Sequence, residues 1–205
     1  MKRIIYLSGF AVALFAIFAI SCQRVEEQKV VEKVSLGKIA LLVAEGFHDG
    51  EAYMPKGFLN NQGFDVVVLG IDSGMVKAYN SNFTINIEKA VRDVSVDDFV
   101  ALVIPGGTGP GVLRDNQEVI DFVSRFWETG KVVAAICHGP QVLVTAGLLE
   151  GRTATSLGAI QGEMEGAGVN FVDQSVVVDG NLITSRIPED MFDFSKAIAD
   201  ALLQP

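Results

Sequence analysis

The chain has 205 residues, of which 49% are hydrophobic and 20% are charged, and its formal net charge is −9. This length suits one globular domain with a substantial core and is short for two. The sequence shows no basic patch, so a nucleic acid is not expected as a partner.

The N-terminal segment has the pattern of an export signal. Lys2 and Arg3 form a positive start, an apolar run follows from Ile4 to Ile20, and small residues lead to Cys22. A cysteine at this place resembles a bacterial lipobox, in which the cysteine is lipidated after cleavage, although Ala19 stands where leucine is commonest. The competing interpretation is an uncleaved membrane anchor, because the apolar run is near the shortest that spans a bilayer.

Both interpretations place the rest of the chain outside the cytoplasm and attached to a membrane. We therefore expect residues 1–21 to be a lipoprotein-type signal peptide, residues 22–37 to be a charged tether, and residues 38–205 to form the domain. If Cys22 carries a lipid, Cys137 is the only free thiol. A single unpaired cysteine in an exported protein raises the question of whether it is reactive.

Within the domain, short apolar runs alternate with amphipathic segments. The runs predict buried strands at 38–44, 64–69, 100–104 and 131–136. Helices are predicted at 51–61, 117–129, 139–146 and 188–203, with a hairpin or irregular excursion at 75–87 and strands around a D-G-N turn at 170–185. Continuous Val/Ile/Leu strands that alternate with helices indicate an α/β fold whose mostly parallel sheet is covered on both faces.

Three loops follow the predicted parallel strands and contain the residues suited to chemistry. They read E-G-F-H-D-G-E after the first strand, P-G-G-T-G-P-G after the third and I-C-H-G-P after the fourth. Ligands of open α/β sheets bind beyond the carboxyl ends of the strands. We therefore expect the functional site where these three loops meet.

The segment A-I-C-H-G, from Ala135 to Gly139, has the spacing of a nucleophile elbow. Small residues two positions before and after a nucleophile let a strand turn sharply into a helix. Cys137 would then be exposed in a strained turn at a helix N-terminus, where free N–H groups favour the thiolate. The alternative is a buried and inert cysteine, the usual state of a free thiol, and these five residues alone do not decide between the two.

The other two loops supply candidate partners for this cysteine. Gly106 and Gly107 permit a close approach of backbone N–H groups, which with the N–H of His138 would form an oxyanion hole, or they form a simple tight turn. The segment does not fit a nucleotide site, because Pro110 lacks an N–H, no glycine stands at the sixth position, and the lysine of a P-loop is missing.

The first loop adds two ionisable residues. Glu51, at the start of the first helix, is placed to share a proton with the thiol or to act as acid and base, although the helix dipole alone also favours an acid there. His48 either lines the same pocket or is a solvated loop residue. We expect no metal and no cofactor.

Four segments together resemble the PfpI (ThiJ/PfpI) family of the class I glutamine amidotransferase-like superfamily. They are A-E-G-F-H-D-G-E, A-L-V-I-P-G-G, V-A-A-I-C-H-G-P-Q and V-V-V-D-G-N-L-I-T-S-R-x-P, and the similarity extends over about 38–203. The resemblance implies a flavodoxin-like three-layer sandwich with a nucleophile elbow. It implies that Cys137 is the nucleophile, that His138 is its neighbour in the catalytic set, and that Glu51 is the acid beside the thiol.

Members of this family have been described as cysteine peptidases, cofactor-independent glyoxalases, deglycases and stress-protective proteins, and they usually form homodimers or larger rings. The chain departs from the peptidase pattern at Gly111, where that pattern has a glutamate that completes a Cys-His-Glu triad, and at His48, where an acidic residue is usual. We therefore expect a glyoxalase-like or deglycase-like enzyme that acts on reactive carbonyls or on glycated small-molecule or protein adducts. The alternatives are a cysteine peptidase or amide hydrolase, and a non-catalytic redox sensor or holdase.

Overall fold

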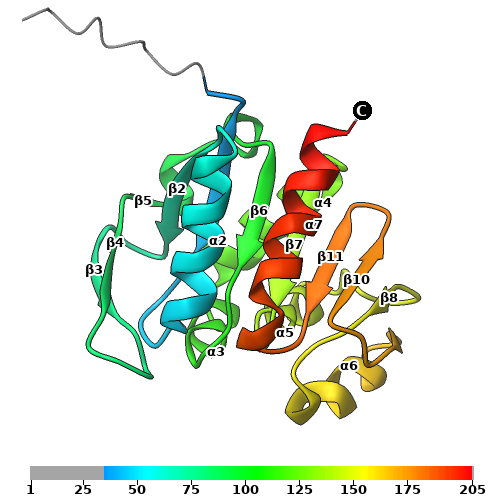
Figure 1. The fold of residues 1–205 in the computed structure, drawn as a ribbon. Helices are drawn as coiled ribbons and strands as arrows, with labels where there is room; N and C mark the ends of the chain where they lie inside the picture. The colour runs from blue at the N-terminus through cyan, green and yellow to red at the C-terminus, as the bar shows by residue number, and fades with distance from the viewer. Residues whose placement is uncertain (1–34, 205) are drawn as a thin grey trace, which may run out of the picture. The chain divides into compact units, whose positions relative to one another are not determined.

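A seven-stranded sheet forms the centre of the structure, a computed structural model that describes residues 35–204 (Figure 1). The strands lie in the order β10–β11–β7–β6–β1–β2–β5, and every neighbouring pair is parallel except β10 and β11. Their bounds are β1 Lys38–Leu42, β2 Asp65–Gly70, β5 Lys89–Ala90, β6 Ala101–Ile104, β7 Val132–Ile136, β10 Val176–Asp179 and β11 Leu182–Ser185. The predicted mostly parallel sheet is confirmed.

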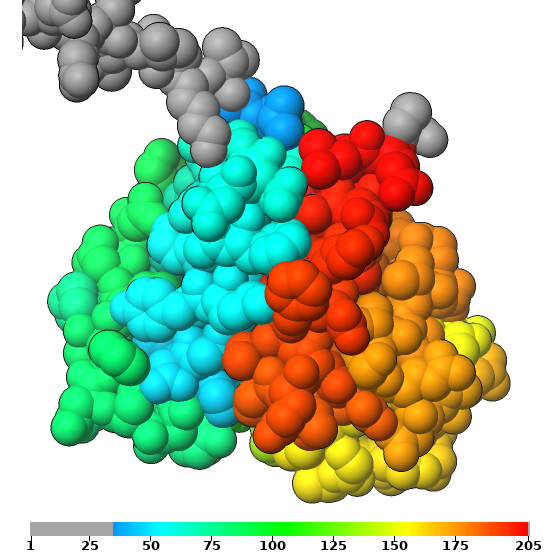
Figure 2. Space-filling view, in the orientation of Figure 1, coloured from blue at the N-terminus to red at the C-terminus, as the bar shows by residue number. Residues whose placement is uncertain are grey.

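Helices cover both faces of this sheet, which makes the fold the expected three-layer sandwich. The helices are α2 Asp49–Asn61, α3 Gly109–Arg114, α4 Gln117–Glu128, α5 Pro140–Thr145, α6 Gln161–Gly166 and α7 Met191–Leu203. Helices α2 and α7 pack on one face, where Figure 2 shows them side by side in cyan and red, and α3, α4 and α5 pack on the other. The unit Val34–Pro205 is compact in itself.

The strands are continuously apolar because each contributes to two hydrophobic cores. In β1, Ile39 and Leu41 point to the face covered by α2 and α7, whereas Ala40 and Leu42 point to the opposite face. A strand buried on both faces cannot alternate polar and apolar residues. This is why the apolar runs of the sequence located the central strands correctly.

Smaller elements complete the fold. They are the antiparallel hairpin β3 Gly74–Lys77 and β4 Thr84–Ile87, the parallel pair β8 Thr153–Ala154 and β9 Asn170–Phe171, and the 3₁₀ helices η1 Val91–Asp93, η2 Val96–Asp98, η3 Gly158–Ile160 and η4 Pro188–Asp190. The predicted excursion at 75–87 is therefore a hairpin. Helices α3 and α6 were not predicted, because their short segments G-P-G-V-L-R and Q-G-E-M-E-G contain glycines and show no apolar period.

The expectations for the N-terminus lie almost wholly outside the described residues. The predicted signal peptide, the predicted lipidation site at Cys22 and all but the last three residues of the predicted tether fall before residue 35. Within residues 35–204, no helix combines the length and the apolar composition that a membrane span requires.

Candidate active site

Cys137 lies directly after β7 in a strained backbone conformation. Its φ is 62°, and it is the one residue other than glycine with a positive φ in the described part of the chain. Its N–H donates to the Ser185 carbonyl at 3.1 Å, and the N–H of Gly139 donates to the Ile136 carbonyl at 2.8 Å, which closes the turn. A Cβ on Gly139 would collide with the Ile104 carbonyl oxygen, so only glycine fits there. The structure thus places Cys137 in the elbow that the small-residue spacing predicted.

The thiol itself is buried, with Cys137 only 6% exposed. Its Sγ lies 3.3 Å from Nδ1 of His138, and the N–H groups of Gly107 and His138 point toward it. A Cβ on Gly106 would lie 2.6 Å from both the Cys137 Cβ and the Glu51 Oε2, so glycine is required for these groups to meet. The expected turn is present, but the expected exposure of the nucleophile is not.

Glu51 is fully buried beside this thiol, at 0% exposed. Its Oε2 accepts a hydrogen bond of 2.8 Å from the N–H of Gly106, and its Oε1 has no hydrogen-bond partner among residues 35–204. Burial raises the pKa of Glu51 to about 7, although the hydrogen bonds from Gly106 and Cys137 act in the opposite direction. A carboxyl group with this pKa exchanges a proton readily near neutral pH.

The environment of Cys137 opposes ionisation. Burial, and after it the Glu51 carboxylate, raise the pKa of the Cys137 thiol to about 12. The N–H groups of Gly107 and His138 act to lower this pKa, as the position at the start of α5 led us to expect. Burial and the Glu51 carboxylate outweigh these N–H groups, so the expectation of an easily formed thiolate is not met. At rest the pair of Cys137 and Glu51 retains at least one proton.

The predicted oxyanion donors are only partly available. The N–H of Gly106 is bound to Glu51, and its carbonyl accepts from the N–H of His48 at 3.0 Å. Gly106 therefore positions Glu51, whereas Gly107, which has a φ of 86°, directs its N–H at the sulfur together with His138. These two N–H groups are suited to stabilise an oxyanion that forms on an atom bound to Sγ.

His138 is half-buried and has a carboxylate nearby. Burial lowers the pKa of His138, and Glu163 opposes this shift. Arg114 holds Glu163 through an ion pair of 2.6 Å to Oε1, and Gln141 donates to Oε2 at 2.7 Å. The sequence analysis missed Glu163, because it lies on the unpredicted helix α6 and no motif marks it. Gly111 supplies no side chain and its Cα faces open space.

His48 caps the helix that contains Glu51. Its Nδ1 accepts a hydrogen bond of 3.4 Å from the Glu51 N–H, and Asn80 Nδ2 lies 3.4 Å from its Nε2. The Tyr79 ring lies edge-on to the imidazole, with 5.8 Å between the ring centroids. The pKa of Tyr79 is raised by burial and by the charges of Cys137 and Glu51. His48 therefore supports Glu51, and the sequence analysis missed Tyr79 at the edge of the site.

Comparisons with known proteins identify the family of the chain. The model of the DJ-1/PfpI family matches residues 37–201. A protein named deglycase from Pyrococcus abyssi is 39% identical over 155 residues, which are 76% of this chain and 93% of that protein. YraA of Bacillus subtilis, provisionally named a cysteine protease, is 39% identical over 159 residues, 78% of this chain and 94% of that protein. The solved structure of Drosophila melanogaster DJ-1beta has a TM-score of 0.77 and 30% identity, and the match covers 82% of this chain and 91% of that one.

Proposed function

Because the chain belongs to the DJ-1/PfpI family, whose named deglycases and proteases indicate a hydrolase-type enzyme, we propose that it acts on reactive carbonyls or their adducts. The proposed nucleophile is Cys137, and the proposed substrates are an α-oxoaldehyde such as methylglyoxal and the adducts that it forms with amines, guanidines and thiols. One observation supports the proposal most strongly. A cysteine in a strained elbow lies beside a buried carboxyl group that titrates near neutral pH.

In the first step, Sγ of Cys137 adds to the aldehyde carbon of the substrate. A C–S bond forms, the π electrons of the carbonyl move to its oxygen, and the N–H groups of Gly107 and His138 stabilise that oxygen. The thiol proton passes to Glu51, so that a thiolate exists only as the bond forms. This pathway suits a thiol whose pKa is raised, because it does not depend on a standing thiolate population.

The second step is an internal redox reaction that needs no external oxidant. Glu51 returns its proton to the oxyanion, then removes the proton on the former aldehyde carbon and delivers it to the adjacent ketone carbon. The hydroxyl proton on the former aldehyde oxygen passes to the ketone oxygen in the same step. The aldehyde carbon is thereby oxidised to a thioester of Cys137, and the ketone is reduced to an alcohol. Water then cleaves the thioester and releases a 2-hydroxy acid. When the substrate is an adduct, the amine, guanidine or thiol leaves with a proton as the C–S bond forms.

Peptide hydrolysis is the second candidate, and the contact of 3.3 Å between Sγ of Cys137 and Nδ1 of His138 favours it. A peptidase also needs a group that orients the imidazole, and losing such a group costs about 10⁴ in kcat in a serine protease. Position 111 is glycine, and both oxygens of Glu163 are engaged by Arg114 and Gln141. These features support carbonyl chemistry over efficient peptide cleavage.

A substrate panel tests the proposal directly. Purified protein is assayed with methylglyoxal, a methylglyoxal-treated peptide and casein, with the Cys137→Ala variant as the control. We expect turnover of the first two that depends on Cys137, and casein hydrolysis near background. Casein cleavage that exceeds carbonyl turnover and is lost in Cys137→Ala would restore the peptidase interpretation.

We also propose that residues 1–21 direct export and that Cys22 is lipidated, so that the domain is attached to a membrane on its extracytoplasmic side. In a bacterial host, acyl labelling of the protein should depend on Cys22. A Cys22→Ala variant that stays membrane-bound with its leader retained would favour the uncleaved anchor.

We propose, on the resemblance to the family, that the domain assembles as a homodimer or a larger homo-oligomer. Light scattering of the purified protein at several concentrations measures its mass in solution. A mass of one chain throughout that range would contradict this assembly.

A further inference from the structure

The tip of the hairpin β3–β4, residues 78–83, is attached to the loop that precedes α2. The N–H of Tyr79 in this tip donates to the Phe47 carbonyl at 3.1 Å. The side chain of Asn80 adds a second connection, because its Nδ2 donates to Oδ1 of Asp49 at 2.8 Å. Phe47 in turn pairs with Gly107, beside the thiol, in an isolated β-bridge. The hairpin tip is therefore connected, through the first loop, to the residues around the nucleophile.

The side chain of Tyr79 has a hydroxyl that is available to a ligand. Its ring lies edge-on to the imidazole of His48, and the residue is 55% exposed. In the part of the chain that the structure describes, the Tyr79 hydroxyl makes no hydrogen bond. The hydroxyl of Tyr53, which also contacts this hairpin, differs because it donates to the Thr84 carbonyl at 2.5 Å. A tyrosine that is held by its ring and its backbone can thus present its hydroxyl to a bound molecule.

The reacting pair lies close enough to Tyr79 to affect its ionisation. Burial raises the pKa of Tyr79, and the charges of Cys137 and Glu51 raise it further. A phenol whose pKa lies above its ordinary value of 10 remains protonated throughout the neutral range. Tyr79 therefore brings an O–H donor, and no charge, to the edge of the active site.

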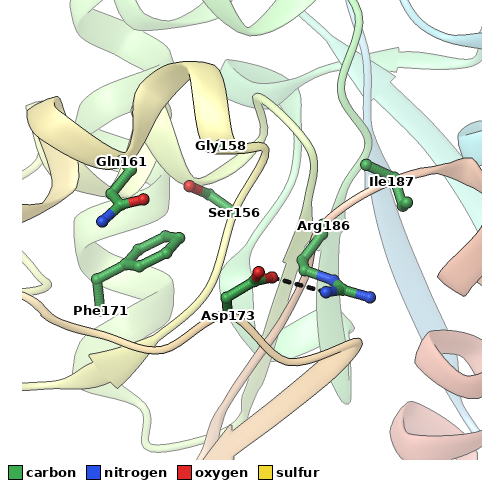
Figure 3. A pocket seen from close by; sticks show the side chains of 7 residues that line it. All are labelled: Ser156, Gly158, Gln161, Phe171, Asp173, Arg186 and Ile187. Carbon is green, nitrogen blue, oxygen red and sulfur yellow. Dashed lines mark hydrogen bonds and ion pairs between the residues drawn. The ribbon is translucent and has the colours of Figure 1, made fainter.

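Other side-chain donors near the elbow are engaged with neighbouring residues. Nε2 of Gln141 donates to Glu163 at 2.7 Å. A cavity of about 220 Å³ on the β11 side of the elbow contains Arg186, whose Nη1 donates to Oδ1 of Asp173 at 2.6 Å (Figure 3). Cys137 does not line that cavity. The unpaired hydroxyl of Tyr79 is thus better suited than these groups to meet a substrate at the thiol.

We propose that the Tyr79 hydroxyl binds the second carbonyl oxygen of the substrate, on the carbon next to the one that Cys137 attacks. In an α-oxoaldehyde, the N–H groups of Gly107 and His138 stabilise the aldehyde oxygen, so the adjacent ketone oxygen needs a separate donor. A hydrogen bond from Tyr79 polarises the ketone, which favours both the addition at the neighbouring carbon and the later reduction of the ketone to an alcohol. Tyr79 thereby favours 1,2-dicarbonyl compounds over simple aldehydes. This assignment rests on the proposed function for the identity of the substrate.

Alkylation of Cys137 tests this hydrogen bond without any turnover. Chloroacetone has a ketone oxygen on the carbon next to the one that the thiol attacks, whereas allyl chloride has no oxygen. The full-length wild type and Tyr79→Phe are treated with each reagent, and modification of Cys137 is followed by peptide mass spectrometry. We expect the ratio of the chloroacetone rate to the allyl chloride rate to fall about fivefold in Tyr79→Phe, the effect of losing one hydrogen bond between uncharged groups. Phenylalanine keeps the ring that packs against His48.

Tyr53→Phe is the matched control, because it removes the other hydroxyl beside the hairpin and should leave the ratio unchanged. An unchanged ratio in Tyr79→Phe, including equal losses with both reagents, would overturn the assignment, because a purely structural role would slow both reactions alike. The same fall in Tyr53→Phe would also overturn it. With methylglyoxal, kcat/KM should fall at least about fivefold in Tyr79→Phe. If methylglyoxal is not turned over, the proposed function fails, and the alkylation ratio still decides the role of Tyr79.

Discussion

Replacing Glu51 with glutamine should abolish most activity and remove the loss of stability that the wild type undergoes as the pH rises through about 7. The buried carboxyl has a pKa of about 7 in the folded chain, against an ordinary value of 4.5. Between these values the folded state retains a proton that the unfolded state has released. The stability that the protonated form contributes is fully present below about pH 4.5 and is lost as the pH rises through about 7.

The magnitude follows from these two pKa values. At about 1.4 kcal/mol per pH unit, the difference corresponds to about 3 kcal/mol of lost stability at alkaline pH, most of it lost between pH 5 and pH 8. Glu51→Gln has no such ionisation. Its amide leaves a buried donor unpaired, at a cost of about 1–3 kcal/mol that does not depend on pH. The stability difference between variant and wild type is therefore compared at two pH values, because the constant cost of the amide cancels in that comparison.

The assay is urea unfolding of the chain from residue 34 onward, wild type and Glu51→Gln, at pH 5 and pH 8. From pH 5 to pH 8, the free energy of unfolding of Glu51→Gln should rise by about 2–3 kcal/mol relative to that of wild type. Glu128→Gln, an exposed change on α4, should alter the unfolding free energy by less than about 0.5 kcal/mol at both. An equal pH dependence in wild type and Glu51→Gln would refute the reasoning that Glu51 is a buried, proton-holding carboxyl.

Three further predictions concern the neighbours of this carboxyl. Alkylation of Cys137 by iodoacetamide should be slow at pH 7 and faster in Glu51→Gln, because removing the carboxylate charge lowers the pKa of the thiol. The pKa of His138, followed by NMR in a chain with 2 histidines, should fall in Glu163→Gln, since Glu163 opposes the lowering caused by burial. Gly106→Ala should reduce kcat/KM at least about a hundredfold, because its Cβ would displace both the thiol and the carboxyl.

Each of these has a contradicting result. Alkylation of wild-type Cys137 with an apparent pKa at or below about 8.5, the value of a free cysteine, would show that burial does not dominate. An unchanged His138 pKa in Glu163→Gln, with the exposed Glu165→Gln as control, would remove the electrostatic role of Glu163. Full activity in Gly106→Ala would mean that the loop after β6 can shift to accommodate the Cβ without displacing the thiol and the carboxyl.

The sequence predicted those parts of the site that depend on backbone geometry. The spacing A-I-C-H-G located the elbow because only small residues fit where the turn approaches the Ile104 carbonyl. Strand ends placed Glu51, Gly107 and Cys137 together, since parallel strands direct their following loops to one edge of the sheet. The fold class followed from the continuous apolar runs for the same reason.

What the sequence did not reveal depends on side-chain environment. The helix N-terminus beside Cys137 suggested a thiolate, but burial and the Glu51 carboxylate reverse the sign of the pKa shift, and neither is visible in the local motif. Glu163 lies on α6, an element of six residues, which leaves no periodic signal. Its relation to the site arises only from the packing of α6 against the elbow.

The most direct test of a Cys137 nucleophile is mass spectrometry of the protein quenched during methylglyoxal turnover. We predict a covalent adduct with the mass of one methylglyoxal, mapped to Cys137 by peptide analysis and absent in Cys137→Ala. Sustained turnover with no adduct at Cys137, or turnover that persists in Cys137→Ala, would contradict the account.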